Sequence, residues 1–511
     1  MLQDIVVGID SSTTATKAIA FDRQGRALAE GRAKIALVNP QPGHFEQDAL
    51  EWWSSLVSAL TSLTSQIAPE RVAAIAISNQ RETFVPLTTQ GVPVRPGTVW
   101  LDERAKAEVE ELARAYGAER IHEVTGKPCD VTPCLYRLQW MRKHEPENFA
   151  RFGMITEVHA YLAYRLTGSF VTSTASADPA AFLDMKTMEY AGELLGHTGL
   201  SVSQFPSLFR PGSVLGHVSD EAARATGLKA GTIVGAAGGD GQCAGTGVNV
   251  FVANRAYVNL GTAVVSGIYA RDYAVERAFR TMTAVSDKGG YIYESVLRTG
   301  SFLVEWMLKT MFQTPPGKEK ELFNALEIEA NAVGIGSGGV MLLPYWAGVM
   351  TPHWNAQARG TITGLNASHG RGHVYRATLE GISLEQTIAT NRAAEASGME
   401  VDHYVAIGGG SNSDLWCQIL ADASGRKVAR SATVEASALG AAMAAARAAN
   451  WFGSVDEASA AMAGQLTDVF NPEKSASARY SELLKIYADL WPTMAAWNAR
   501  LVDFLDEEKT R

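Results

Sequence analysis

The chain has 511 residues, which is more than one hydrophobic core usually serves, so we expect two domains with a ligand site between them. Its composition, 46% hydrophobic and 19% charged without a low-complexity tract, excludes a largely disordered protein. A formal net charge of -9 and the lack of a Lys and Arg cluster argue against a nucleic-acid partner.

Cysteine content and the N-terminus bear on the compartment. Four cysteines are too few and too scattered for a disulfide framework, and no further Cys or His pair completes a zinc tetrahedron. The first ten residues run into a short apolar segment without the basic region or long apolar stretch of an export signal or membrane anchor. We therefore expect a cytoplasmic protein that does not associate with membranes.

The first half of the chain begins with strand signals. Apolar runs at 4–9 and 17–21 flank the hydroxyl-rich segment 10–14, which predicts a hairpin with a polar tip. A helix is expected from about Ala49, where apolar residues recur at helical spacing behind Gln-Asp. Residues 72–78 predict the next strand.

The second half repeats this order. Strands are expected at 256–260 and 263–269, separated by the small polar turn Gly261-Thr262. A strand at 404–407 ends in the glycine-rich segment 408–413, and an amphipathic helix follows. The repetition indicates duplicated α/β domains, which we place at residues 1–252 and 253–511, with the last helix packing back on the first domain.

The two polar turns are candidate phosphate sites. Phosphate is bound by backbone N–H groups, hydroxyls and positive charge, and Thr13, Thr14 and Lys17 offer all three. An ordinary hairpin tip is the alternative, but Gly261-Thr262 supplies a matching turn from the other domain. The one GxGxxG, at 334–339, precedes an apolar run and not a helix, so we predict a loop there.

Two further segments carry chemistry. Asp240 lies between glycines, in a predicted loop between strands, where a carboxylate can serve as general base or magnesium ligand; an Asx turn is the alternative. The segment Gln80-Arg81-Glu82-Thr83 follows a strand, where open α/β sheets bind ligands. Its Arg and Glu can share several hydroxyls, although an exposed ion pair would explain them equally well.

Taken together, these segments resemble the FGGY family of carbohydrate kinases over nearly the whole chain. The segment 360–365, followed by 373–380, agrees with the family's C-terminal signature position by position. The N-terminal signature is kept less well: Trp140 is present, but Arg137 and Cys134 depart from it. The resemblance implies an α/β fold of two duplicated actin-like (ribonuclease H-like) domains with an interdomain cleft. It also implies transfer of phosphate from ATP, with Mg²⁺, to a hydroxyl of a small sugar or polyol.

The resemblance assigns roles residue by residue. Asp240 matches the general base, and Asp10 and Asp240 the metal site. The acceptor pocket would contain Gln80, Arg81, Glu82, Trp100, Asp240 and Gln242. The nucleotide would be held by Thr13, Thr14, Lys17, Gly261, Thr262, Glu305, Gly409, Gly410 and Ser411.

The acceptor stays open on sequence alone. Segment 80–83 is similar to the glycerol kinases of the family, whereas most of the chain is similar to its xylulose kinases, so a ketopentose of the xylulose type is expected and glycerol or another polyol is the alternative. A sugar-independent ATPase of the actin and Hsp70 type, or a catalytically inactive sugar-binding protein, would be the alternatives of another class. A homodimer is common in the family.

Overall fold

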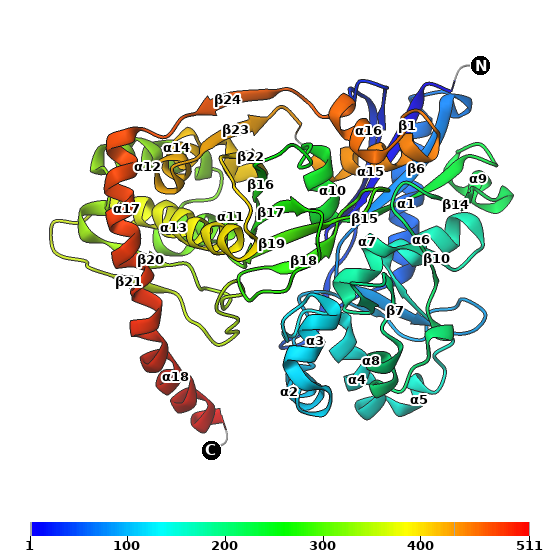
Figure 1. Cartoon of the computed structure of the whole chain (residues 1–511), viewed down its shortest axis with the longest axis horizontal. Helices are drawn as coiled ribbons and strands as arrows, with labels where there is room; N and C mark the ends of the chain where they lie inside the picture. The colour runs from blue at the N-terminus through cyan, green and yellow to red at the C-terminus, as the bar shows by residue number, and fades with distance from the viewer. Residues whose placement is uncertain (1–2, 434, 510–511) are drawn as a thin grey trace.

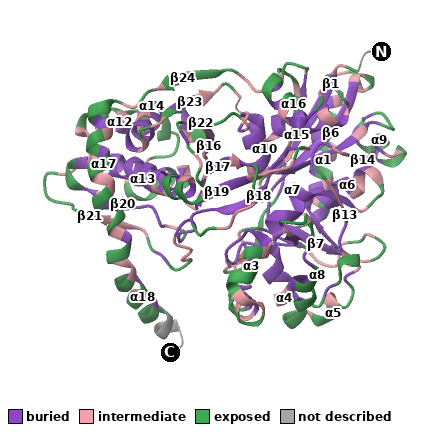
Figure 2. Ribbon diagram, in the orientation of Figure 1, coloured by how far each residue is buried: buried purple, intermediate pink, exposed green. Residues whose placement is uncertain are grey.

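The computed structural model describes residues 3–433 and 435–509. Two α/β halves lie side by side, and the chain runs from the first half into the second, as the colours of Figure 1 show. Each half is built on its own mixed sheet. Buried residues concentrate in the two sheets and in the helices that cover them (Figure 2).

The first sheet has the order β14-β15-β6-β1-β2-β3. Its strands are β1 (Ile5–Ser11), β2 (Ala15–Phe21), β3 (Ala27–Lys34), β6 (Val72–Asn79), β14 (Val214–His217) and β15 (Ile233–Gly239). The first three form an antiparallel meander, and β6 and then β15 add in parallel beside β1. The hairpin expected around 10–14 and the strand expected at 72–78 are both confirmed.

The second sheet has the order β18-β19-β17-β16-β22-β23-β24. Its strands are β16 (Arg255–Leu260), β17 (Val264–Ala270), β18 (Arg280–Thr283), β19 (Tyr291–Leu297), β22 (His403–Ile407), β23 (Lys427–Ser431) and β24 (Leu466–Phe470). A meander of β16, β17 and β19 is again followed by two parallel strands, β22 and β23. The shared strand order confirms the duplicated actin-like domains.

Helix α1 (Ala49–Thr64) covers the first sheet and begins where the sequence predicts. Asp48 caps it by accepting a bond of 2.8 Å from the Leu50 N–H, which satisfies one of the unpaired amides of the first turn. Its apolar face, with Trp52 and Leu56, packs in one core with Ile75 of β6.

A smaller unit lies beside the first sheet and is built from two segments, one before β6 and one between β6 and β14. It contains a five-stranded sheet in the order β4-β5-β8-β7-β9 and a helical cluster. Its strands are β4 (Val38–Gln41), β5 (His44–Gln47), β7 (Phe84–Leu87), β8 (Gly97–Thr98) and β9 (Met154–Glu157), and short strands β10 (Val171–Ser173), β11 (Leu183–Asp184), β12 (Glu189–Tyr190) and β13 (Ser207–Phe209) follow. Its helices and those next to it are α2 (Lys106–Leu112), α3 (Ala118–Thr125), α4 (Cys134–His144), α5 (Pro146–Phe149), α6 (Val158–Thr167), α7 (Thr174–Ala177), α8 (Gly192–His197), α9 (Asp220–Thr226) and α10 (Asp240–Gly247).

The second half is organised around the long helix α13, whose side chains are mostly buried. Its helices and short strands are α11 (Ser301–Trp306), α12 (Glu319–Val333), β20 (Met341–Leu343), β21 (Thr361–Thr363), α13 (Arg371–Ser397), α14 (Asp414–Ser424), α15 (Ala436–Ala448), α16 (Val455–Met462), α17 (Lys474–Ala488) and α18 (Leu490–Lys509). None of the helices in the described part of the chain combines the length and the apolar composition needed to cross a membrane.

The chain returns to the first half, but not through its last helix as the sequence analysis expected. Helices α15 and α16 pack on the first sheet, in one core with Val6, Ala74 and Ala237. The chain then goes back as β24. Helix α18 instead packs on the second half. Its Trp491 ring contacts the Tyr345 ring, and its Asn498 side chain donates to the Gln357 carbonyl.

The return of α15 depends on backbone-to-backbone contact. A Cβ added to Gly440 would lie 1.9 Å from the Cys243 carbonyl oxygen, and one added to Gly8 would lie 1.8 Å from that of Ala438. No side chain fits between these backbones, so glycine is required on both faces of the helix packing.

Gly440→Ala is therefore expected to destabilise the protein although alanine favours helix. We expect a loss of about 1–3 kcal/mol from overpacking, visible as a lower Tm in calorimetry. Gly196→Ala in α8 is the control, because a Cβ there meets nothing within 4 Å. An unchanged Tm for Gly440→Ala would contradict the close packing.

Candidate active site

Asp240 is the first residue of α10 and follows β15 directly, so it lies at a strand-to-helix junction and not in a loop between strands. Its Oδ1 accepts a bond of 2.7 Å from the Gly241 N–H and lies 3.1 Å from Nε of Arg81. Burial raises the pKa of the Asp240 carboxyl, and the Arg81 guanidinium opposes that rise. The side chain keeps 40% of its exposure, so it is accessible to a ligand.

Asp10 stands at the end of β1, beside the hairpin tip. Ser78 of the parallel neighbour β6 donates its hydroxyl to Oδ1 of Asp10 over 3.0 Å. Burial and then the charge of Asp240 raise the pKa of Asp10 to about 7. In the sheet register Asp10 is opposite Ser78 and Ser78 is opposite Gly238, two residues before Asp240, so the two carboxylates belong to the same end of the sheet.

Two neighbouring carboxylates suit a hard divalent cation. Mg²⁺ is commonly held by one or two protein carboxylates together with substrate phosphates and water. The described residues contain no cluster of three or more metal-ligating side chains, and a Mg²⁺ site does not require one. Asp10 and Asp240 therefore fit the metal that the sequence predicts.

The phosphate candidates of the first hairpin have defined partners. Nζ of Lys17 lies 2.6 Å from both carboxylate oxygens of Glu435, which directly precedes α15. Thr13 accepts a bond of 3.0 Å from Nε1 of Trp100 on its hydroxyl and one of 2.6 Å from Nε2 of Gln47 on its carbonyl. Thr14 is exposed at the tip.

Arg81 and Glu82 are buried, so the exposed ion pair considered as an alternative is excluded. Their side chains keep only 8% and 5% exposure. Arg81 Nη1 lies 2.7 Å from Glu294, and Glu82 lies 2.5 Å from Arg280. Glu82 also has a φ of +47°, a left-handed conformation that costs a non-glycine residue energy.

Gln80 and Gln242 are buried at the same place. Gln80 Nε2 donates to Oε1 of Gln47 over 2.8 Å, and Gln242 Nε2 donates to a main-chain oxygen over 2.9 Å. Gln47 therefore joins the segment 80–83 to the carbonyl of Thr13. The structure brings Asp10, Lys17 and Asp240 together with this segment and Trp100.

Sequence reasoning missed four side chains of this cluster: Gln47, Glu294, Arg280 and Glu435. The only signal for Glu294 is its place inside an otherwise apolar strand, Tyr291–Leu297. Burial opposes its ionisation, but the guanidiniums of Arg81 and Arg280 prevail and lower the pKa of Glu294. A second buried ion pair joins Nζ of Lys127 to Oδ1 of Asp178 over 3.0 Å.

Arg137, which departs from the family signature, has a structural role. It is fully buried in α4 and donates to the carbonyls of Val99, Glu82 and Thr132. The planar guanidinium can serve three carbonyls at once, which an ammonium at the end of a flexible stem does less well. It thereby holds the carbonyl of the left-handed Glu82. Helix α4 itself begins at Cys134.

A second group of predicted residues gathers at the ends of the second sheet. The N–H of Ser301, which opens α11, donates to the Gly261 carbonyl over 2.8 Å, and that of Gly300 donates to Thr262 over 2.7 Å. Glu305 is exposed on α11. A Cβ on Gly410 would lie 2.8 Å from the Leu260 carbonyl, so the turn that contains Gly409, Gly410 and Ser411 packs against the turn at 261 and 262.

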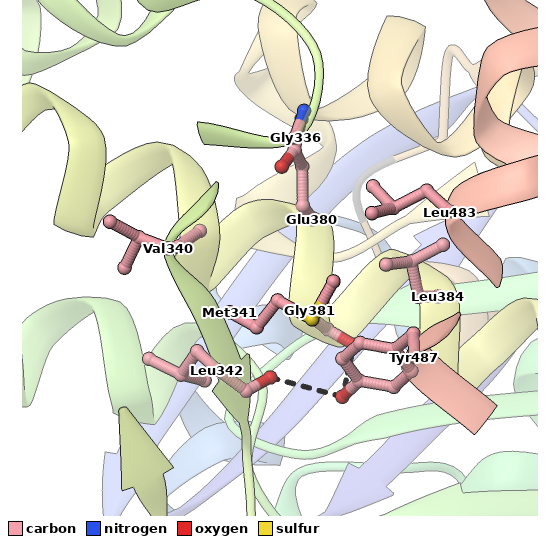
Figure 3. Close-up of a pocket in the computed structure, with 10 residues that line it drawn as sticks. Gly336, Val340, Met341, Leu342, Glu380, Gly381, Leu384, Leu483 and Tyr487 are labelled. Carbon is pink, nitrogen blue, oxygen red and sulfur yellow. Dashed lines mark hydrogen bonds between the residues drawn. The ribbon is translucent and has the colours of Figure 1, made fainter. Parts of the chain in front are cut away.

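The donors of the GxGxxG segment are used within the protein, in agreement with the loop predicted there. The N–H of Gly336 and the hydroxyl of Ser337 donate to the two oxygens of Glu380, over 3.0 and 2.8 Å. The cavity beside it, bounded by Leu342 and Tyr487, is shown in Figure 3. Its volume of about 10 Å³ holds no more than one water, so this segment is not a nucleotide site.

Comparison with known proteins bears on the family and the fold of the chain. The N-terminal domain of the FGGY family of carbohydrate kinases matches residues 5–247, and the family's C-terminal domain matches residues 244–449. A xylulose kinase from Escherichia coli strain K12 is 30% identical over 83% of this chain and 85% of its own length. A glycerol kinase from Acidovorax sp. strain JS42 is 31% identical over 89% and 92%.

A solved structure has the same fold. The ligand-bound xylulose kinase from Lactobacillus acidophilus superposes with a TM-score of 0.90 at 24% identity, over 97% of this chain and 99% of that one.

Arg137→Lys is expected to lower stability by about 1–3 kcal/mol, because a lysine leaves buried carbonyls of the segment around Glu82 without donors. Urea unfolding followed by fluorescence measures the change. Arg142→Lys, an exposed position on the same helix whose side chain donates to one carbonyl, is the control and should change stability by no more than about 0.5 kcal/mol. Equal stability of both variants would show that Arg137 does not hold this segment.

Proposed function

This chain belongs to the FGGY family of carbohydrate kinases, and from that membership we propose that it transfers phosphate from ATP to a hydroxyl of a ketopentose of the xylulose type. The observation that carries the proposal is Asp240, an accessible carboxylate held beside Arg81 at the end of β15. Family membership removes the sugar-independent ATPase as an alternative. The E. coli relative called a xylulose kinase supports the choice of acceptor.

Asp240 acts as the general base in this proposal. Phosphoryl transfer needs alignment and charge neutralisation more than covalent help, and a positioned base adds about 10² to 10⁴ in rate. The Asp240 carboxylate takes the proton of the acceptor hydroxyl as that oxygen bonds to the transferred phosphorus. Arg81, held on its other side by Glu294, fixes the orientation of the carboxylate.

The remaining pocket residues orient the acceptor. In the proposal the acceptor contacts Gln80, Arg81, Glu82, Trp100 and Gln242, all of them buried except Trp100. A ketopentose offers several hydroxyls to these polar and charged side chains. Trp100 also donates to Thr13 of the phosphate hairpin over 3.0 Å. The acceptor pocket and the phosphate hairpin are therefore physically joined, which favours in-line alignment.

Two turns hold the nucleotide in the proposal. Thr13, Thr14 and Lys17 bind the transferring phosphate, and Gly261 with Thr262 binds the nucleotide from the second half. Gly409, Gly410 and Ser411 take the adenosine, with Glu305 on the ribose side. Lys17 has to exchange Glu435 for phosphate, because its ammonium contacts both oxygens of that carboxylate.

Asp10 and Asp240 would hold the Mg²⁺ of the nucleotide. When bound, the ion neutralises charge on the phosphates. Burial first and the charge of Asp240 second raise the pKa of Asp10, and the charge of a bound cation would oppose this rise, which supports the assignment.

Glycerol is the second candidate acceptor. Gln80-Arg81-Glu82-Thr83 is similar to the substrate segment of glycerol kinases, and the glycerol kinase from Acidovorax is 31% identical to this chain. A buried polar pocket rejects a substrate that leaves its charged groups unpaired. A ketopentose offers these groups more hydroxyls than glycerol does, which is why we place it first.

Asp240→Asn is expected to lower kcat by roughly 10² or more, since the amide cannot take the proton, while ATP binding measured by calorimetry is retained. Asp220→Asn is the control: it is also the first residue of a helix, but is exposed on α9. Sugar-dependent turnover within a few-fold of the parent would contradict the assignment of Asp240.

Side-by-side kcat/KM values for xylulose and glycerol test the acceptor. We expect the higher value for xylulose. A glycerol value ten-fold higher corresponds to about 1.4 kcal/mol of transition-state preference and would reverse the choice.

A further inference from the structure

Five side chains, the last of them Asp240, form a chain of alternating charge. The order is Glu82, Arg280, Glu294, Arg81, Asp240, and the successive separations are 2.5, 2.7, 2.7 and 3.1 Å. The first four side chains are at most 8% exposed. Each guanidinium joins two carboxylates, one through Nε and the other through Nη1, so neither is free for an anionic ligand without losing a partner.

The chain of charges is assembled from both halves. Arg81, Glu82 and Asp240 belong to the first half, whereas Arg280 on β18 and Glu294 on β19 belong to the second. Arg280 and Glu294 are direct cross-strand partners in the β18–β19 ladder, which fixes their spacing. Strand β18 contacts α7 of the first half, which brings the pair to the acceptor segment.

The sum of these charges decides what the pocket accepts. Three carboxylates against two guanidiniums leave one negative charge in excess, and the nearby Lys127–Asp178 pair adds none. An acceptor with a carboxylate or phosphate group would meet repulsion where water screens little. Hydroxyls, in contrast, can donate to carboxylates and accept from guanidinium N–H groups.

We propose that Arg280 and Glu294 are specificity-determining positioning residues, which hold Glu82 and Arg81 so that the site selects an uncharged polyhydroxyl acceptor over the matching sugar acid. The inference rests on the proposed function and deepens it. Arg280 and Glu294 act through Arg81 and Glu82, and need not touch the acceptor themselves.

The experiment uses the full chain with two matched pairs of acceptors, xylulose with xylonate and glycerol with glycerate. For the parent we expect kcat/KM for each acid to be at least 10²-fold below that of the better neutral acceptor. Glu294→Gln should lower the neutral value at least ten-fold and raise the acid-to-neutral ratio at least ten-fold, with KM for ATP within two-fold. Glu294→Asp keeps the charge and should keep the ratio.

Controls separate selectivity from folding. Glu329→Gln removes the exposed ion-pair partner of Arg371, and we expect it to change neither the acid-to-neutral ratio of kcat/KM nor the Tm. If Glu294→Gln does not fold, Arg280→Lys takes its place. This variant keeps the positive charge but loses the guanidinium that joins Glu82 to Glu294. We expect kcat/KM for the neutral acceptor to fall about ten-fold, with KM for ATP unchanged.

The outcomes are distinguishable. A parent enzyme that uses an acid as well as the neutral sugar overturns the inference. So does a Glu294→Gln variant whose Tm falls while the acid-to-neutral ratio stays, because the pairs would then only brace the two halves. A parent that phosphorylates none of the four compounds would instead refute the proposed function.

Discussion

The contact of α15 with the first sheet fixes the relation between the halves. The helix approaches its neighbours so closely that glycine is needed at two contacts: Gly8 of β1 meets the helix at Ala438, and Gly440 of the helix meets α10 at Cys243. Its N-terminal end carries Glu435 to Lys17 and the Ser437 hydroxyl to the Asp240 carbonyl, over 3.1 Å. This close backbone contact thus positions the second half beside Lys17 and Asp240.

The same arrangement explains how so many charges can be buried at one place. An isolated buried charge is costly, and each member of the chain from Glu82 to Asp240 is compensated by a neighbour. Because Arg280 and Glu294 come from the other half, the compensation exists only when the halves are in place.

Much of the fold could be predicted from local sequence. The hairpin before Lys17, the Asp48 cap and the repeat around Gly261 are encoded by short patterns of apolar spacing and turn residues, and the structure has them. Asp240 and the segment 80–83 were found because glycines and polar residues interrupt apolar strands. Arg280, Glu294 and Glu435 were not, because their partners are distant in sequence and only the crossing of the chain between halves brings them near. The sequence does not show that α15, in place of α18, returns to the first half, for the same reason: an alanine-rich helix indicates burial but not against which sheet.

The left-handed Glu82 and its anchor Arg137 have a consequence for how acceptor preference could change among related enzymes. The short segment around Glu82 takes its shape from a guanidinium in α4, well outside it in sequence. A graft of residues 80–83 alone into another scaffold would carry the side chains but not the backbone conformation that presents them. If the segment binds the acceptor as proposed, acceptor preference is inherited as a unit of segment and anchor, and exchanging one without the other leaves the same side chains on a backbone of different conformation.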